Sequence, residues 1–138
     1  MKLIVYTDGG SRGNPGIAWC GVFIRSLDGS ITERRFKYLG VATNNIAEYT
    51  GGLLGIQRAI ELGATEIELR ADSKLMIEQL SGNYKVKNAE LKKIWLQIHE
   101  SLSNWWWKII FTHVYREDNI EADRLSNVAM DEGGKNKK

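Results

Sequence analysis

The sequence predicts an α/β protein with a mixed five-stranded sheet, three antiparallel strands plus two parallel ones, flanked by helices. First, three β-rich runs follow one another with short links, which is typical of an antiparallel meander. Second, two later β-rich runs alternate with segments of helical periodicity, which is typical of parallel strands joined by right-handed crossovers. Third, the chain has 138 residues, the length of one domain that builds its core without disulfides.

The N-terminal part of the chain predicts the meander. Residues 2–7 (KLIVYT) form a short apolar β-rich run, which predicts a buried strand. The glycine-rich segment GGSRGNPG after it predicts a loop. Residues 17–26 and 30–39 predict the second and third strands, and Asp28-Gly29 between them is a hairpin turn signal.

The middle of the chain predicts two helices around a fourth strand. Asn45 with Glu48 three residues later is typical of a helix N-terminus, and apolar residues at helical spacing follow. Glycines inside this helix indicate close approach to a sheet or a ligand; they are Gly51, Gly52 and Gly55. Residues 65–71 alternate with period two and predict a strand, and residues 74–80 predict the next helix.

The C-terminal part predicts two more helices around a fifth strand. Asn88 is expected to cap a helix whose buried face carries Leu91, Ile94, Trp95, Ile98 and Leu102. Residues 105–114 (WWWKIIFTHV) predict the strand, and residues 119–130 predict the last helix. Core packing is favoured over base stacking for the three tryptophans, because adjacent strand residues face opposite ways.

Composition excludes several classes of protein. No run fits a signal peptide or a spanning helix, and Cys20 as the single cysteine agrees with a reducing compartment. We therefore expect a cytoplasmic protein with no membrane segment. We also expect a single domain over residues 1–132 and a disordered basic tail over residues 133–138, because GGKNKK has no pattern.

Net charge does not indicate a nucleic-acid partner. The formal charge is +2, but three lysines lie in the tail, which leaves 16 basic and 17 acidic residues in the body. A typical duplex-binding protein has a strong basic excess.

Four acids stand near the ends of predicted elements. Asp8 follows the first strand, Asp72 follows the fourth, and Glu48 and Asp123 lie in the first turns of helices. Each alone has an ordinary structural explanation. A carboxylate caps a helix or favours its N-terminal dipole, and Asp8 can accept hydrogen bonds from the glycine loop.

Taken together, the four acids favour a metal site. The first and fourth strands are expected to be neighbours, and the helix N-termini bring the other two acids to the same edge. Carboxylates that close repel one another unless something compensates them. Oxygen ligands suit Mg²⁺ or Mn²⁺, whereas two His and one Cys are too few for a zinc site. A pair of divalent ions held this way suits in-line phosphoryl displacement.

Four segments carry a family resemblance: YTDGGSRGNPG, TNNIAEY, ADS and EADRLSN occur in this order. The chain resembles type 1 ribonucleases H, also called ribonucleases HI, over all but the tail. The resemblance implies a ribonuclease H-like fold. It also implies hydrolysis of the RNA strand of RNA–DNA hybrids by two metal ions, leaving 3′-hydroxyl and 5′-phosphate ends. It implies two Mg²⁺ ions per active site, with Mn²⁺ as the alternative. The catalytic and metal-binding residues it implies are Asp8, Glu48, Asp72 and Asp123.

The resemblance also implies residues that contact the substrate. Those expected near the scissile phosphate and the ribose 2′-hydroxyls are Gly9, Gly10, Asn14, Asn44 and Asn45. Thr43 and Asn88 match a pocket for a phosphate of the DNA strand. Helix capping is an equally good explanation for both residues.

The chain departs from the family pattern in two places. Many members have a catalytic histidine in the loop before the last helix. Here His113 is expected to end the strand at the margin of the site, with an auxiliary catalytic role as the alternative, and Arg116 or Glu117 would take the vacant place. Between the second and third helices, only Lys85 and Lys87 stand where some members have a basic protrusion. The chain is similar to the subset without that protrusion, so weak, salt-sensitive binding of hybrids is expected.

These observations predict a monomeric endoribonuclease that acts on RNA–DNA hybrids. Two alternatives stay open. The first is a non-catalytic hybrid-binding module on the same fold, although the full set of four carboxylates weighs against it. The second is a related superfamily nuclease that acts on another duplex, such as a retroelement-derived or resolvase-like enzyme that cuts DNA. The asparagines favour RNA, but they do not exclude activity on double-stranded RNA.

Overall fold

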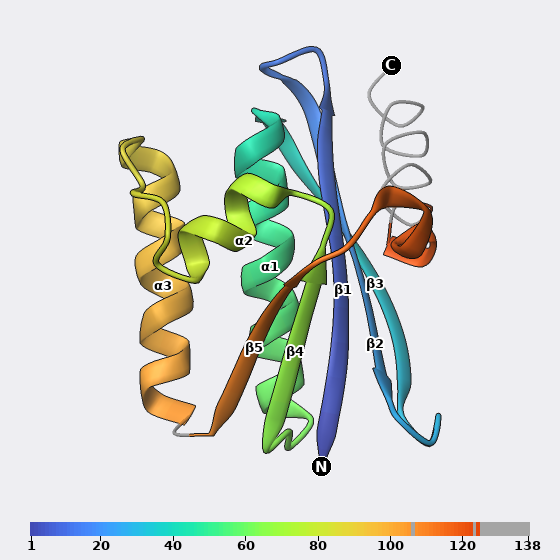
Figure 1. The fold of residues 1–138 in the computed structure, drawn as a ribbon. Helices are drawn as coiled ribbons and strands as arrows, with labels where there is room; N and C mark the ends of the chain where they lie inside the picture. The colour runs from blue at the N-terminus through green and yellow to red at the C-terminus, as the bar shows by residue number, and fades with distance from the viewer. Residues whose placement is uncertain (106, 123, 125–138) are drawn as a thin grey trace.

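The computed structural model describes residues 1–105, 107–122 and 124. Its centre is a five-stranded sheet in the order β3-β2-β1-β4-β5 (Figure 1). The strands are β1 (Lys2–Arg12), β2 (Gly16–Ser26), β3 (Thr32–Ala42), β4 (Glu66–Ala71) and β5 (Lys108–His113). β1, β2 and β3 pair antiparallel, whereas β4 pairs parallel with both β1 and β5. The predicted mixed sheet is confirmed.

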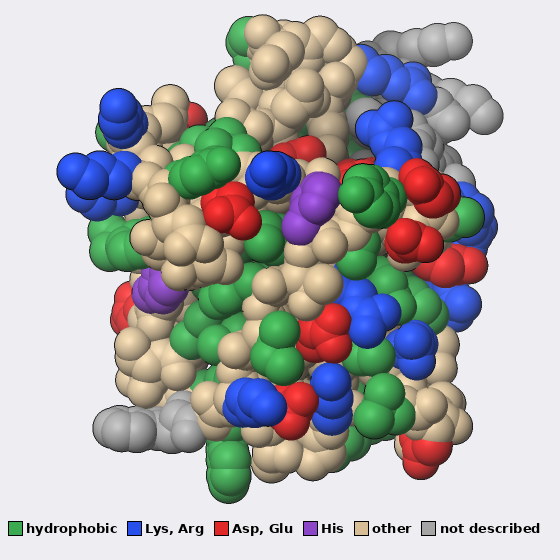
Figure 2. All heavy atoms as spheres, viewed as in Figure 1, with side chains coloured by type: hydrophobic (Ala, Val, Ile, Leu, Met, Phe, Trp, Pro, Cys, Tyr) green, Lys and Arg blue, Asp and Glu red, His purple; other side chains and the backbone are tan. Residues whose placement is uncertain are grey.

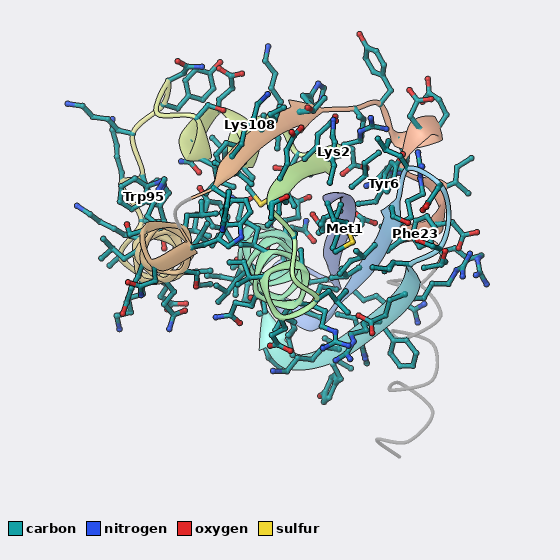
Figure 3. The ribbon with its side chains drawn as sticks, turned by 90° about the horizontal axis from the view of Figure 1, so that it is seen from below. Met1, Lys2, Tyr6, Phe23, Trp95 and Lys108 are labelled. Atoms are coloured by element: carbon teal, nitrogen blue, oxygen red, sulfur yellow. The ribbon has the colours of Figure 1, made fainter. Side chains whose placement is uncertain are left out.

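Helices cover one face of the sheet. They are α1 (Asn44–Glu61), α2 (Lys74–Leu80) and α3 (Ala89–Trp105), followed by a short 3₁₀ turn, η1 (Arg116–Asp118). α1 lies across β1 and β2, and α3 packs beside α1 (Figures 1 and 3). The main core lies between α1 and the sheet, where Leu3, Val5, Ile56 and Leu69 are fully buried. No described helix is long and apolar enough to cross a membrane.

The glycines of α1 permit the close approach to the sheet that the sequence predicts. A Cβ at Gly55 would lie 2.6 Å from Cγ1 of Val5, and one at Gly51 would lie 3.2 Å from the backbone oxygen of Asp8. Because no side chain separates the two backbones, the first turns of α1 lie directly against the C-terminal half of β1.

Several predicted boundaries in the first half of the chain are wrong: β3 begins and ends two to three residues later than predicted, and two further differences lie near the acids. β1 continues past Thr7 to Arg12, because its glycine-rich end also pairs with β2. This additional pairing begins with Asp8, which stands opposite Gly21. Only residues 13–15 form the turn, which contains a cis peptide bond before Pro15. α1 also begins earlier than predicted, since its N-cap is Thr43 and not Asn45.

The C-terminal boundaries also differ from the prediction. Trp105 is the last residue of α3 and not the start of a strand, and its indole Nε1 donates to the backbone oxygen of Ala64 at 2.7 Å. Its ring is buried, as the core interpretation required, whereas Trp107 is 62% exposed. Of the predicted last helix, residues 120–122 and 124 are helical. The rest of that helix and the tail lie outside the described residues.

Candidate metal centre

Three of the four predicted acids meet at one edge of the sheet. Asp8 lies within β1, Glu48 lies in the second turn of α1, and Asp72 directly follows β4. Each offers a carboxylate oxygen, and these oxygens all lie within 4.8 Å of one another. Asp123, the fourth predicted acid, lies outside the described residues.

Strand register and helix packing produce this convergence. Thr7 of β1 stands opposite Ala71 of β4 in a parallel pair, so the residue after each is an aspartate at the same level of the sheet. Glu48 comes from α1, whose backbone reaches β1 at Gly9. A Cβ on Gly9 would lie 2.4 Å from the carbonyl carbon of Ala47 and 2.6 Å from the amide nitrogen of Glu48.

The site is partly closed to water, which perturbs its electrostatics. Asp8 is only 7% exposed. Burial raises the pKa of Glu48 to about 7, and the negative charge of Asp72 acts in the same direction. A hydrogen bond from the Ser73 hydroxyl and the positive charge of Arg116 oppose this rise. At neutral pH a proton on Glu48 therefore relieves part of the repulsion among the carboxylates.

The donor set fits a hard divalent cation. Three carboxylates, and no His or Cys, form this group among the described residues. Oxygen ligands of this kind are those that Mg²⁺ and Mn²⁺ prefer. A bound cation would neutralise negative charge of the cluster. When no cation is bound, a proton on Glu48 neutralises part of that charge.

Comparisons with known proteins identify the family. A family model described as "Reverse transcriptase-like" matches residues 6–129. A ribonuclease HI of Rickettsia prowazekii is 31% identical over 141 residues, which cover 91% of this chain and 88% of that protein. The chain belongs to the ribonuclease H family. A solved structure, LC11-RNase H1 in complex with an RNA/DNA hybrid, has 37% sequence identity and a TM-score of 0.89, over 95% of this chain and 98% of that one.

Some relatives of this ribonuclease H family chain are much longer. A bifunctional protein of Mycobacterium tuberculosis is 45% identical over 132 residues, which cover 95% of this chain but 36% of that protein. The chain thus spans about a third of the length of the first curated relatives that it matches.

Polar residues tie the β1–β2 turn of the chain to the start of α1. The side-chain oxygen of Asn14 accepts from the backbone N–H of Asn44 at 3.2 Å. The side-chain oxygen of Asn44 accepts in turn from the backbone N–H of Ser11 at 2.7 Å and from its hydroxyl at 3.0 Å. The neighbouring Asn45 is exposed at the start of α1. The turn is therefore held in a fixed position against the start of α1.

Thr43 and Asn88 are both helix caps. The Thr43 hydroxyl accepts from the backbone N–H of Ile46 at 3.2 Å. The side-chain oxygen of Asn88 accepts from the backbone N–H groups of Glu90 and Leu91 at 2.9 and 3.0 Å. The capping explanation is confirmed for both residues, and it leaves the hydroxyl hydrogen of Thr43 and the amide N–H₂ of Asn88 free for a ligand.

His113 ends β5, as predicted, opposite Ala71 and next to the strand end that carries Asp72. It is exposed, and its ring meets the ring of Tyr115 edge-on at 5.9 Å. This places it at the margin of the carboxylate cluster.

Three contributions to the site are visible only in the structure. Gly9 faces α1 and admits its backbone, whereas a Cβ on Gly10 would meet only the side-chain oxygen of Asn44, at 3.9 Å. Ser73 caps α2 in place of Asp72 and also holds Glu48. The Nε of Arg116 lies 3.8 Å from an Asp72 oxygen. In the sequence, the pair Asp72-Ser73 before a predicted helix could have identified Ser73 as the cap. No sequence pattern indicates that Gly9 faces α1.

Proposed function

We propose that this chain is a metal-dependent endoribonuclease that hydrolyses the RNA strand of RNA–DNA hybrids, leaving 3′-hydroxyl and 5′-phosphate ends. The observation that carries the proposal is the convergence of Asp8, Glu48 and Asp72 within 4.8 Å in a chain of the ribonuclease H family. Relatives named ribonuclease HI, and a neighbour solved with an RNA/DNA hybrid, support the substrate class.

The proposal assigns two divalent ions, Mg²⁺ or Mn²⁺, to the carboxylates. When bound, such a pair supplies an activated water and stabilises the charge on the leaving 3′-oxygen. Asp8, which is only 7% exposed, would be the central ligand of the ions. Glu48 and Asp72 would fix the positions of the ions, and Asp123 would help to hold them for activation of the water.

The proposal assigns recognition of RNA to the β1–β2 turn and the start of α1. The carboxamide oxygens of Asn14 and Asn44 are used within the protein, so their N–H₂ groups remain as donors for ribose 2′-hydroxyls. Asn45 is exposed beside them. Gly10 leaves space for the backbone of the RNA strand, because a Cβ there would meet almost nothing.

The proposal assigns phosphate contacts to residues around this surface. Thr43 and Asn88 stand at the N-termini of α1 and α3, where free donors and the helix dipole favour an anion. Arg116 is 78% exposed beside Asp72 and takes the place of the family's loop histidine. In this position its guanidinium would contact a phosphate during turnover or product release.

Incubation of the protein with end-labelled duplexes tests the proposal. The duplexes are an RNA–DNA hybrid, double-stranded RNA and double-stranded DNA, each with Mg²⁺, Mn²⁺ or a chelator. We expect cleavage of the RNA strand of the hybrid with either metal and none in the chelator. Asp8→Asn should reduce the rate by about 100-fold or more, since even outer-shell partners of metal ligands contribute 10–100-fold.

The matched control is Glu100→Gln, which removes an exposed carboxylate on α3 away from the cluster. It should cleave the hybrid at the unmodified rate. Hybrid binding without metal-dependent cleavage would select the non-catalytic binding module. Cleavage of double-stranded DNA in place of the hybrid would select the related superfamily nuclease.

A further inference from the structure

A second concave site, lined by none of the three carboxylates, lies between α1 and the strands β2 and β3. It is a cavity of about 220 Å³. Its lining includes Cys20 and Val22 from β2, Lys37 from β3, and Leu54 and Arg58 from α1. Figure 3, which looks along α1, shows β3 curving beside the helix. The α1 residues of the cavity follow Glu48 by six to thirteen positions, roughly 9–20 Å along the helix.

The floor of the cavity is apolar. Val22 is 3% exposed and Cys20 is 1% exposed, and Leu54 is partly buried against the main core. Burial raises the pKa of the Cys20 thiol to about 12, against a smaller opposing effect of the Lys37 ammonium. The thiol is therefore neutral at physiological pH and behaves as a small hydrophobic group.

The rim of the cavity carries one positive charge that no acid of the described residues compensates. Arg58 pairs with Glu33 at 2.7 Å and with Glu61 at 3.0 Å, and Arg35 pairs with Glu33 at 3.2 Å. Among the described residues, Lys37 forms no ion pair with a carboxylate. These three cations and two acids together leave a charge of +1, which matches a monoanion.

The size of the cavity limits the ligand further. An apolar cavity of about 150 Å³ accommodates benzene, so about 220 Å³ accommodates a ring together with a short acidic arm. We propose that this cavity binds a small organic acid, with a ring or branched apolar body on the floor of Cys20, Val22 and Leu54 and its carboxylate on Lys37. This site is separate from the proposed metal centre and does not depend on the proposed nuclease activity.

Titration of the folded protein with three small probes tests this proposal. The probes are 3-phenylpropionate, which has both the ring and the carboxylate, 3-phenylpropan-1-ol, which has only the ring, and acetate, which has only the carboxylate. Binding is followed by the backbone amide NMR shifts of Val22, Lys37 and Leu54. We expect 3-phenylpropionate to bind about fivefold or more tightly than the alcohol, as one ion pair contributes about 1 kcal/mol. Acetate should cause no saturable shift.

Two variants and one control complete the test. Lys37→Gln should weaken 3-phenylpropionate to the affinity of the alcohol and leave the alcohol unchanged. Leu54→Phe, which fills the cavity, should abolish binding of both compounds, with circular dichroism used to verify folding. Lys93→Gln, an exposed lysine on α3, should change neither affinity. Equal affinities of acid and alcohol for the unmodified protein, or saturable shifts confined to other residues, would overturn the proposal.

Discussion

Gly9 occupies a position where two backbones meet and no side chain fits. A Cβ there would lie within 2.6 Å of three backbone atoms of Ala47 and Glu48, whereas a Cβ on Gly10 meets only one atom, at 3.9 Å. The contact at Gly9 sets the distance between Asp8 and Glu48. Gly9 is therefore a positioning residue for the proposed metal centre.

The pair Gly9→Ala and Gly10→Ala tests this role. Gly9→Ala must push α1 away from β1, so we expect a loss of about 1–3 kcal/mol in the free energy of unfolding. We also expect weaker Mg²⁺ binding, measured by calorimetry on the folded protein. Gly10→Ala should retain the stability and the Mg²⁺ affinity of the unmodified chain. Equal effects of the two substitutions would contradict the assignment.

Glu68 is a buried carboxylate on the face of the sheet opposite α1. Arg70 Nε donates to it at 2.7 Å and the Thr112 hydroxyl at 3.1 Å, and Lys2 Nζ lies 3.4 Å away. Basic and acidic side chains are interspersed over this face (Figure 2). On the same face, Tyr6 and Phe23 stack at 5.8 Å, and Arg25 and Arg34 lie over their rings (Figure 3). The charged side chains thus cover two rings that α1 leaves uncovered on this face.

The hydrogen bond from Arg70 lowers the pKa of Glu68 below its ordinary value of 4.5. Its contribution to stability is therefore complete above pH 4.5 and is lost as the pH falls through the lowered folded value. We expect Glu68→Gln to cost about 1.5–3 kcal/mol at pH 7 and progressively less below pH 4.5, measured by urea unfolding. Glu66→Gln, on the same strand with one partner, should cost less than about 1 kcal/mol. A cost of Glu68→Gln that is independent of pH would exclude this explanation.

At the scale of elements, α1 is built from residues that weaken an isolated helix. Its glycines lower helix propensity, but Gly55 faces β1 so closely that a Cβ would lie 2.6 Å from Val5. Gly52 faces the flexible side chain of Met76 instead, with its Cβ position 3.5 Å from the sulfur. A methyl group at Gly55 would therefore collide with a packed strand, whereas one at Gly52 would meet only a flexible side chain.

Alanine substitutions separate the two cases. Gly52→Ala should stabilise the protein by about 0.5–1 kcal/mol through helix propensity, since the Met76 side chain can adjust. Gly55→Ala should destabilise it by about 1–3 kcal/mol, because Val5 lies on a packed strand. Thermal unfolding measures both. Stabilisation by Gly55→Ala would show that α1 moves away from the sheet at little cost.

The elements that the sequence predicted correctly are those with a clear period and a local terminator. α2 agrees residue for residue, and β4 differs by one residue, because alternation and capping residues define both. β1 was predicted five residues too short, because Gly9 and Gly10 are typical of a loop and only pairing with β2 makes them a strand. Trp105 was assigned to a strand because its aromatic neighbours are typical of one, whereas its indole bond to Ala64 belongs to the end of α3.

The features of the candidate site also divide into those that the sequence could predict and those that it could not. The meeting of Asp8 and Asp72 could be predicted, since β1 and β4 were expected to be neighbours with these two residues at the same level. The parallel pair of Thr7 and Ala71 confirms that level, although β1 itself continues past Asp8. The family resemblance left Arg116 and Glu117 as alternatives for the vacant histidine place. The contact of Arg116 with Asp72 could not be predicted, because η1 is a short irregular turn with no periodic pattern. The cavity at Lys37 could not be predicted either, since it depends on the separation of α1 from β3 and on which arginines find acidic partners.

At the scale of the whole molecule, charge distribution matters more than net charge. The formal charge is +2, yet three carboxylates are held together in a partly closed site. Two like charges about 4–5 Å apart at an effective dielectric of 20 repel by roughly 3–4 kcal/mol. The fold therefore carries a local instability at the proposed metal centre, which bound divalent cations would remove.

Asp8→Asn separates the stability of this centre from its proposed activity. The measurement is thermal unfolding at pH 8, above the Glu48 pKa of about 7, so that Glu48 is charged in the unmodified protein. In chelator, Asp8→Asn should stabilise the protein by about 1–3 kcal/mol, because one of the repelling charges is gone. In Mg²⁺ the unmodified protein should gain about 1.4 kcal/mol at ten times its dissociation constant, and the variant should gain almost nothing. Glu100→Gln should change neither value. A variant that is destabilised in chelator and still stabilised by Mg²⁺ would show that Asp8 serves the fold and not a metal ion.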